Sequence, residues 1–365
     1  MNVKKNVIKW ILPVVVLLSA CKKNDQPVAT APILQPAKGV YILSEGGFAA
    51  NNSKLAYRDT AGVVSGDFFL QQNPSLTAGL GDLGNDMIIY GSKMYIVMNG
   101  SGNVTVLNAV TGAFISQISF GGSGTSNKNP RYALGARGNL YVTAWDNSVS
   151  MIDTASLGIT GAALVGATPE GLAIAGNFLY VANSGGLNYP DYDSTVSVVD
   201  LTTMLEIKKI KVGLNPQKIE VNSAGKVFVT AYGDAFATIP IPATVSVINS
   251  STNLLETTLG SDYQFDHVRI FNDIAYFYNN YGGGNIKMYN TITNSLVRNN
   301  FITDGTLITT SYGLNIDEQN GDVYVTDAKD FVTAGEVTCF SAGGVRKLSF
   351  SIAPGVNPNK VLFVR

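Results

Sequence analysis

His267 is the only histidine in the chain, and it stands directly after Asp266. A single histidine excludes metal sites built from several histidines, and any Ser-His-Asp triad would have to use this residue. A lone histidine in a loop beside a ligand serves more often as a hydrogen-bonding contact than as a catalyst. We therefore expect a binding role for His267 and no catalytic residue.

Three other features could carry chemistry, but each has a simpler interpretation. Asp191 and Asp193 could help to bind Ca²⁺, which needs several oxygen ligands, yet two carboxylates without a full ligand loop favour turn capping. The glycines 282–284 do not lead from a strand into a helix, so they indicate a hairpin, not a phosphate loop. Cys339 lies in an alternating stretch and is expected to be a small packed residue. The sequence predicts no metal and no cofactor.

The other cysteine, Cys21, lies at the end of an export signal. Lys4, Lys5 and Lys9 precede a short apolar run that is about half the ~20 residues needed to span a membrane. The run ends in LSAC, which resembles the bacterial lipobox, although an ordinary signal peptide with a chance cysteine is the alternative. We predict a signal peptide over 1–20, a lipidated Cys21 with a tether over 21–38, and one domain over 39–365.

Charge and composition narrow the class of protein. The formal net charge is −1, and it falls to −4 when residues 1–20, with three lysines and no acid, are removed. Nucleic-acid binding would favour a basic surface instead. Only 14% of residues are charged, and no helical apolar period of useful length is present. Many small polar residues between short apolar runs are typical of strands and turns, and the domain must fold without a disulfide.

Repeats give the architecture. An aromatic followed by strand residues recurs seven times, as YILS, YIVM, YVTA, YVAN, FVTA, YFYN and YVTD, starting at 41, 95, 141, 180, 228, 276 and 324. A second strand motif follows each one, and several of these end in Asp or Asn before Thr or Ser, which favours a tight turn. Seven strand-rich units of about 40–50 residues predict an all-β fold, a seven-bladed β-propeller.

The two chain ends are expected to complete one blade together. The domain begins at GVYIL, a second strand with no first strand before it, and the C-terminal PGVNPNKVLFV matches VGLNPQKIEV at 212–221. Residues 359–364 therefore supply the missing innermost strand of blade one. This closes the ring and removes an exposed sheet edge.

The motifs resemble those of known propellers. LYVAN and TVSVVD followed by a VG-x-x-P step are similar to the YVTN repeat of YncE-like and surface-layer propellers, over nearly all of 39–365, although the usual PDG turns are lacking. Three longer segments, YILSEGGFAANNSKLAYRD, GLGDLGNDMIIYGSKMYIVMN and NSGGLNYPDYDSTVSVVD, resemble the BtuG-type cobalamin-binding lipoproteins of Bacteroidota. That resemblance implies capture of a corrinoid, delivery to a TonB-dependent outer-membrane transporter, and a lipid-anchored position at the outer membrane, exposed on the cell surface.

The topology of a propeller predicts which face binds the ligand. With the four strands of a blade lettered A to D from the centre outward, the D–A and B–C connections lie on the same face, and ligands of propellers lie over the channel there. The D–A entries are expected to place these residues at the channel mouth: Asn85, Asp86, Arg131, Tyr132, Glu170, Gln217, Lys218, Asp266, His267 and Tyr312.

The B–C loops of that face are unequal in length, whereas the A–B turns are uniformly short, as for a binding surface on a rigid scaffold. The loops contribute further candidates: Trp145, Tyr189, Tyr192, Tyr232, Phe236, Tyr281 and Phe331. Aromatic side chains among Asn and Gly favour a large amphipathic ligand such as a corrinoid, though some of them are expected only to pack their own loops. An adhesion or surface-layer module that binds protein or glycan is the alternative, and a propeller lyase or lactonase is a third.

Overall fold

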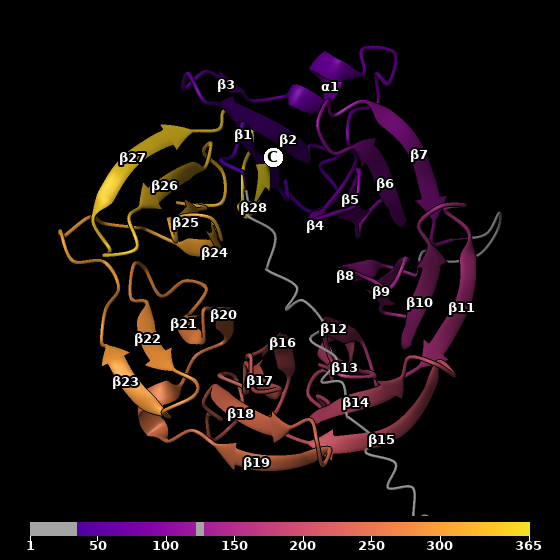
Figure 1. The fold of residues 1–365 in the computed structure, drawn as a ribbon, viewed down its shortest axis with the longest axis vertical. Coiled ribbons are helices and arrows are strands. Elements are labelled where there is room, and N and C mark those ends of the chain that lie inside the picture. The colour runs from indigo at the N-terminus through magenta and orange to yellow at the C-terminus, as the bar shows by residue number, and fades with distance from the viewer. Residues whose placement is uncertain (1–34, 122–127) are drawn as a thin grey trace, which may run out of the picture. The chain divides into compact units, whose positions relative to one another are not determined.

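In the computed structural model, which describes residues 35–121 and 128–365, seven four-stranded antiparallel sheets surround a central channel (Figure 1). This confirms the predicted seven-bladed β-propeller. The predicted signal peptide, Cys21 and most of the tether lie outside the described residues. Among the described residues, no helix is long and apolar enough to cross a membrane.

Blades two to seven are consecutive in the chain, and each contains its A to D strands in order. Blade two contains β4 (Gly84–Tyr90), β5 (Lys93–Met98), β6 (Asn103–Asn108) and β7 (Phe114–Ser119), and blade three contains β8 (Pro130–Ala136), β9 (Asn139–Ala144), β10 (Ser148–Asp153) and β11 (Ile159–Leu164). Blade four contains β12 (Pro169–Ala175), β13 (Phe178–Asn183), β14 (Thr195–Asp200) and β15 (Leu205–Lys211), and blade five contains β16 (Pro216–Val221), β17 (Lys226–Ala231), β18 (Thr244–Asn249) and β19 (Leu254–Thr258). Blade six contains β20 (His267–Phe271), β21 (Ile274–Tyr278), β22 (Lys287–Asn290) and β23 (Ser295–Arg298), and blade seven contains β24 (Ser311–Ile316), β25 (Val323–Asp327), β26 (Glu336–Phe340) and β27 (Arg346–Ser351). Two short 3₁₀ helices, η1 (Gly186–Asn188) and η2 (Ser261–Tyr263), lie in connections.

Blade one combines the two ends of the chain, as predicted. Its strands are β28 (Pro358–Val364), β1 (Gly39–Ser44), β2 (Lys54–Asp59) and β3 (Val64–Ser65). β28 pairs antiparallel with β1, with Ile42 opposite Val361. The C-terminal strand is also tied to both neighbouring blades, because the Asn359 side chain donates to the Gly84 carbonyl at 2.8 Å and Asn315 accepts from the Val361 amide at 2.9 Å.

The outer edge of blade one departs from the pattern. Its D strand β3 has only two residues and leads into α1 (Phe68–Gln72), a helix too short to leave a helical period in the sequence. The side chain of Asp67 caps α1 by accepting from the Leu70 amide. Phe68 is buried against Tyr41 and Tyr57, with ring centroids 5.7 and 4.9 Å away, so the helix covers the apolar face that a longer D strand would cover.

The aromatic residue that recurs in the sequence is a buried packing residue. It belongs to the B strand of each blade and lies between neighbouring sheets, where Tyr41, Tyr95 and Tyr180 are wholly buried and Tyr141 and Phe228 almost so. Tyr276 is also buried and Tyr324 is partly buried. Burying one such side chain contributes about 1.5–3 kcal/mol, so these residues hold the blades against one another without a disulfide. Cys339 is a free, buried thiol on β26, which confirms that it is a packed residue.

The Asp and Asn residues that end the C strands form the expected tight turns. The Asp200 carboxylate accepts from the amides of Thr202 and Thr203 at 2.7 and 3.1 Å. Asn290 accepts from Ile292 and Thr293, both at 2.9 Å. These side chains satisfy backbone donors that the C–D turn leaves free, which is why the Asp/Asn-Thr/Ser pattern recurs in the sequence.

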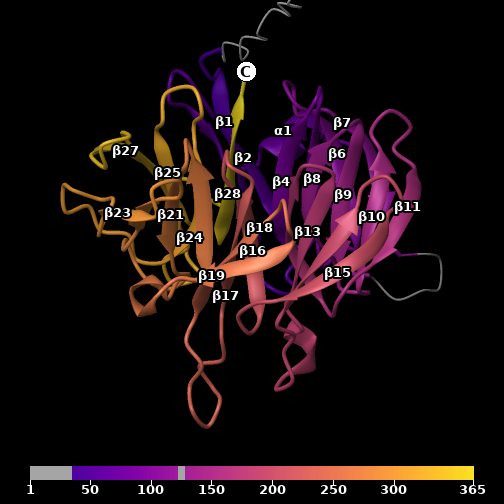
Figure 2. The ribbon, with the colours of Figure 1, turned by 60° about the horizontal axis from the view of Figure 1, so that its bottom comes forward.

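The two faces of the disc differ in the length of their loops. We call the face with the D–A and B–C connections the mouth face and the other the opposite face. The A–B turns of the opposite face range from two residues (91–92) to six (317–322), while the B–C loops of the mouth face range from three (145–147) to twelve (232–243). Figure 2 shows the β13–β14 and β17–β18 loops projecting furthest from the mouth face.

Candidate ligand-binding site

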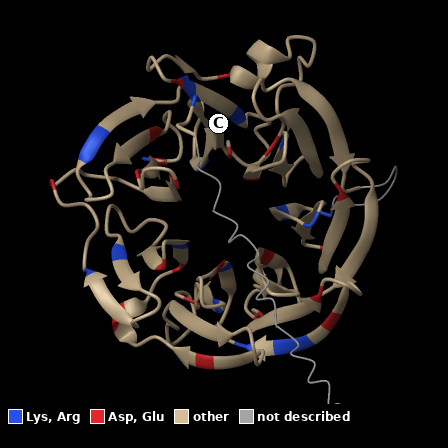
Figure 3. Cartoon of the chain, in the orientation of Figure 1, with Lys and Arg blue, Asp and Glu red and all other residues tan. Residues whose placement is uncertain are grey.

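The innermost strands of all seven blades line a cavity of about 430 Å³ in the channel. Its wall is mainly polar and charged near the start of these strands, and charged residues of both signs surround the channel in Figure 3. Aliphatic side chains such as Leu134, Ile219 and Leu314 also line it. The polar and aromatic lining residues are Glu45, Asn85, Asp86, Tyr90, Arg131, Tyr132, Lys218, Glu220, Tyr232, His267, Arg269, Tyr278, Asn280, Tyr312, Asn315, Asn359 and Lys360.

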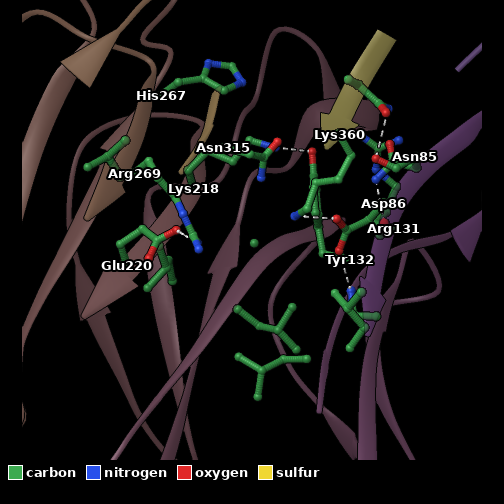
Figure 4. A pocket seen from close by; sticks show the side chains of 18 of the residues that line it. Asn85, Asp86, Arg131, Tyr132, Lys218, Glu220, His267, Arg269, Asn315 and Lys360 are labelled. Carbon is green, nitrogen blue, oxygen red and sulfur yellow. Dashed lines mark hydrogen bonds and ion pairs between the residues drawn. The ribbon is translucent and has the colours of Figure 1, made fainter. Parts of the chain in front are cut away.

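Two ion pairs in this wall connect neighbouring inner strands. Lys360 on β28 meets the Asp86 carboxylate on β4 at 2.9 Å, and Arg269 on β20 meets Glu220 on β16 at 2.8 Å (Figure 4). The second oxygen of Asp86 accepts from the Ala133 amide on β8 at 3.0 Å, so this carboxylate joins three blades. These contacts fix the wall in position.

Arg131 is held on the wall by blades three and four together. Its Nε donates to Glu170 Oε2 at 2.9 Å, and the Trp145 ring lies under the guanidinium at 4.6 Å. The other oxygen of Glu170 accepts from Trp145 Nε1 at 2.9 Å. Burial lowers the pKa of Arg131, but Glu170 together with Tyr132 and Glu45 raises it by more, so the guanidinium stays charged.

Lys218 reaches from β16 past blade four to Tyr132 on β8. Its Nζ donates to the Tyr132 hydroxyl and lies 3.9 Å from the centre of that ring. Among the described residues, no carboxylate forms an ion pair with Lys218, whereas the other lysine and arginines of the cavity wall, Lys360, Arg131 and Arg269, each have one.

Glu45 is a site residue that the sequence analysis missed. It lines the cavity from the start of the β1–β2 loop, and its Oε2 accepts from the Tyr312 hydroxyl at 2.5 Å. Burial raises the pKa of Glu45, although Tyr312 and the charges of Arg131 and Lys218 oppose the shift. A positional signal existed, because Glu45 directly follows its B strand, as Trp145 and Tyr232 follow theirs.

His267 lies at the mouth among aromatic rings. Its Nδ1 pairs with Asp266 at 2.7 Å, and its ring centre is 5.0 Å from Tyr278 and 6.0 Å from Tyr232. Burial lowers the pKa of His267, and its hydrogen bond to the Asp266 carboxylate only partly offsets this. The ring is therefore mainly neutral at pH 7, with its orientation fixed by the carboxylate.

The structure brings eight predicted residues together on the cavity wall: Asn85, Asp86, Arg131, Tyr132, Lys218, Tyr232, His267 and Tyr312. Trp145, Glu170 and Asp266 stand behind them and hold Arg131 and His267. Gln217 is buried, bonds to Asn215 and is not part of the wall.

The remaining aromatic candidates form the rim. Phe236 and Tyr281 are 84% and 72% exposed, and Tyr189 is 60% exposed with its ring 5.8 Å from that of Tyr192. Phe331 links the rim to the wall, since its ring lies 5.4 Å from Tyr281 and 5.8 Å from Tyr312. These rings present flat apolar area on the B–C loops of the mouth face.

Asp193 has a structural role of the kind that the sequence favoured. One carboxylate oxygen accepts from the Ser194 amide and the Thr195 hydroxyl, and the other from the Ala167 amide. Over residues 35–121 and 128–365, no group of three or more His, Cys, Asp or Glu side chains is arranged to hold a metal ion.

The fold and site define a seven-bladed β-propeller with a charged channel mouth and an aromatic rim. No protein-family model matches the chain, and no curated protein matches its sequence. Solved structures match its fold. A quinonprotein alcohol dehydrogenase-like protein from Bacteroides thetaiotaomicron has a TM-score of 0.62 at 16% identity, over 90% of this chain and 78% of that one.

Two further structures have the same kind of fold. Dihydro-heme d1 dehydrogenase NirN in complex with DHE has a TM-score of 0.56 at 10% identity, over 92% of this chain and 78% of that one. Hydrazine synthase of Kuenenia stuttgartiensis has a TM-score of 0.55 at 17% identity, over 69% and 74%. At these identities the matches establish the propeller fold alone, which is consistent with a ligand-binding or protein-interaction role.

Proposed function

We propose that this protein is a lipid-anchored, surface-exposed binding protein whose ligand lies over the channel on the mouth face. The observation that carries the proposal is the gathering of the cavity, its charged wall and the exposed aromatic rim on one face. The opposite face has only short turns. Small-molecule sites are usually concave and use precisely placed polar groups to fix the orientation of the ligand.

A corrinoid is the favoured ligand, handed on to a TonB-dependent transporter. The sequence resemblance to BtuG-type lipoproteins suggests it, and the rim supports it, because a macrocycle fringed with amides needs flat apolar area and hydrogen-bonding partners together. The cavity of about 430 Å³ is near the lower end of ligand pockets, which span about 300–1,000 Å³. A corrinoid would therefore rest mainly on the rim loops and place only one part in the channel.

The test is co-elution. The full chain is mixed with cyanocobalamin at micromolar concentration and passed through a gel-filtration column, where the red chromophore is expected to travel with the protein. Cyanocobalamin that elutes separately at these concentrations would refute the corrinoid. Bovine serum albumin run in parallel controls for non-specific carriage.

A protein or glycan partner is the second candidate, and the exposed apolar tips of the two projecting loops favour it. Leu187, Tyr189, Phe236 and Ile239 are each more than half exposed there. A pull-down from outer membranes that captures a protein or glycan, with no small molecule bound, would favour this candidate.

We infer no catalytic activity. His267, on which a lyase or lactonase would depend, is neutral and packed between Tyr232 and Tyr278 with Asp266 at its Nδ1. His267→Ala is expected to change ligand affinity. Turnover of a lactone or polysaccharide that disappears in this variant would instead establish an enzyme.

A further inference from the structure

Among the described residues, the cavity wall contains a lysine, Lys218, that forms no ion pair, and it lies beside Arg131, which has one. Where blades three, four and five meet, Arg131 and Lys218 contribute two cations, and Glu170 contributes one carboxylate. The other cations of the wall are paired, because Lys360 has Asp86 and Arg269 has Glu220. Two neighbouring cations inside a narrow cavity with protein walls attract anions more strongly than the same charges on an open surface.

Arg131 is oriented so that part of its guanidinium remains available. Its one hydrogen bond in the described part of the chain uses Nε, and Glu170 and Trp145 hold the group from that side. Both oxygens of the Glu170 carboxylate are engaged, one by Arg131 and the other by Trp145. The two terminal nitrogens of Arg131 are left to donate into the cavity. That planar pair of donors matches the oxygens of a carboxylate or phosphate.

Lys218 stands close to the same place. Its ammonium lies over the Tyr132 ring at 3.9 Å, and the Arg131 guanidinium is 5.6 Å from that same ring. One aromatic ring therefore positions both cations. Tyr132 supplies one hydroxyl to Lys218, so the ammonium keeps further donors for a ligand.

Glu45 faces this pair of cations without forming an ion pair with either. Its carboxyl oxygen is instead bonded to the Tyr312 hydroxyl, on the other side of the mouth. Because it is not held by Arg131 or Lys218, it leaves their free donors unoccupied. An anionic group arriving through the mouth would displace no existing ion pair.

We propose that Arg131 and Lys218 form an anion subsite in the channel mouth, which takes a carboxylate or phosphate group of the ligand. This subsite deepens the proposed function. It rests on that function in one respect, namely that the carboxylate or phosphate belongs to the ligand that covers the mouth. The ligand class becomes an amphipathic molecule with an anionic group, which enters the cavity while its apolar part lies on the rim.

The subsite can be tested without the unidentified ligand, because Trp145 is a built-in reporter. Trp10 and Trp145 are the two tryptophans of the chain, so the Trp10→Phe variant of the full chain leaves only the ring that stacks on Arg131. Sodium phosphate and, separately, sodium acetate are titrated at constant ionic strength while Trp145 emission is recorded. We expect a saturable change with at least one anion.

Lys218→Gln is the decisive variant, since Lys218 has no ion pair to lose and the protein should fold normally. It is expected to weaken anion binding at least fivefold. Arg137→Gln is the matched control, because Arg137 is exposed on the opposite face and bonded to Asn177, and it should leave the midpoint unchanged. Saturation by phosphate alone or by acetate tells which anion the subsite prefers.

No saturable change with either anion, or the same midpoint in Lys218→Gln, would overturn the subsite. Neither outcome depends on a corrinoid. If cyanocobalamin does not co-elute but anion binding requires Lys218, the corrinoid is refuted as the ligand and the anion subsite is supported.

Discussion

The cations of the channel wall fall into two kinds. Lys360 and Arg269 each meet a carboxylate on the neighbouring inner strand, at 2.9 and 2.8 Å. Arg131 and Lys218 instead converge on Tyr132, and only Arg131 has a carboxylate partner. The two kinds of cation therefore serve different purposes in the channel wall. Paired charges between blades hold the ring together, and incompletely paired charges near the mouth are available to a ligand.

The largest effect is expected from removing the closing strand. Deletion of 355–365 takes away β28, its pairing with β1 and the Lys360–Asp86 ion pair. The innermost edge of blade one is then unpaired, which favours aggregation. We expect an unfolded or aggregated product in circular dichroism and gel filtration. A soluble truncated protein with an unchanged melting temperature would refute the role of this closure.

The next effect concerns the ion pair behind the mouth. Glu170→Ala leaves the Arg131 guanidinium without its carboxylate, where the two side chains are only 16% and 5% exposed. Losing one partner of such a pair costs about 3–5 kcal/mol of unfolding free energy. Urea denaturation measures this. Glu256→Ala breaks the more exposed ion pair with Lys226 and should cost about 0–1 kcal/mol. Equal losses in the two variants would contradict the distinction.

The rim should matter for binding and not for stability. Phe236→Ala and Tyr281→Ala remove rings that are 84% and 72% exposed, so the melting temperature should hardly change. Each loss of apolar contact is expected to weaken cyanocobalamin binding about tenfold, or about 1.4 kcal/mol, in equilibrium dialysis. Phe114→Ala, on the outer strand β7, is the control and should leave affinity unchanged. A rim variant that binds as well as the control would remove that ring from the site.

The smallest effect is a dependence of anion affinity on pH. Tyr312, Arg131, Lys218 and Glu170 surround Glu45, and burial raises its pKa. Below that pKa Glu45 is uncharged; as the pH rises through it, the carboxylate forms and repels a bound anion. Affinity for sulfate, whose charge is constant over this range, should therefore fall on the order of fivefold. Glu45→Gln should abolish the fall, and an unchanged pH profile in this variant would exclude Glu45 as its cause.

The features that could be predicted from the sequence are those that recur from blade to blade, because the same position is buried or forms the same turn in each blade. One large aromatic recurs in every B strand, and an Asp or Asn ends the C strand in six of the seven blades, because the blades need the same packing and a similar turn. The closing strand was predictable for the same reason, since β28 has to pair with a B strand, as every other A strand does. The entries to the A strands therefore located the channel mouth correctly.

The finer geometry was not predictable from spacing. A β-bulge between Pro216 and Lys218 shifts the register at the start of β16, and it decides that Lys218 faces the cavity while Gln217 is buried beside it. Glu45 follows its B strand directly, as Trp145 and Tyr232 do, but its loop has no counterpart of equal length in the other blades, so position alone did not single out its side chain. Lys218 and Tyr132 are on strands of different blades, and their contact depends on side chains that cross in front of blade four.

Hydrogen–deuterium exchange with and without saturating cyanocobalamin tests the central claim, that the ligand lies over the channel on the mouth face. Protection is expected in the B–C loops over residues 184–194, 232–243 and 279–286. The A–B turns of the opposite face, such as 222–225, should exchange at the same rate in both samples. Protection confined to those turns, or no protection anywhere, would contradict the account.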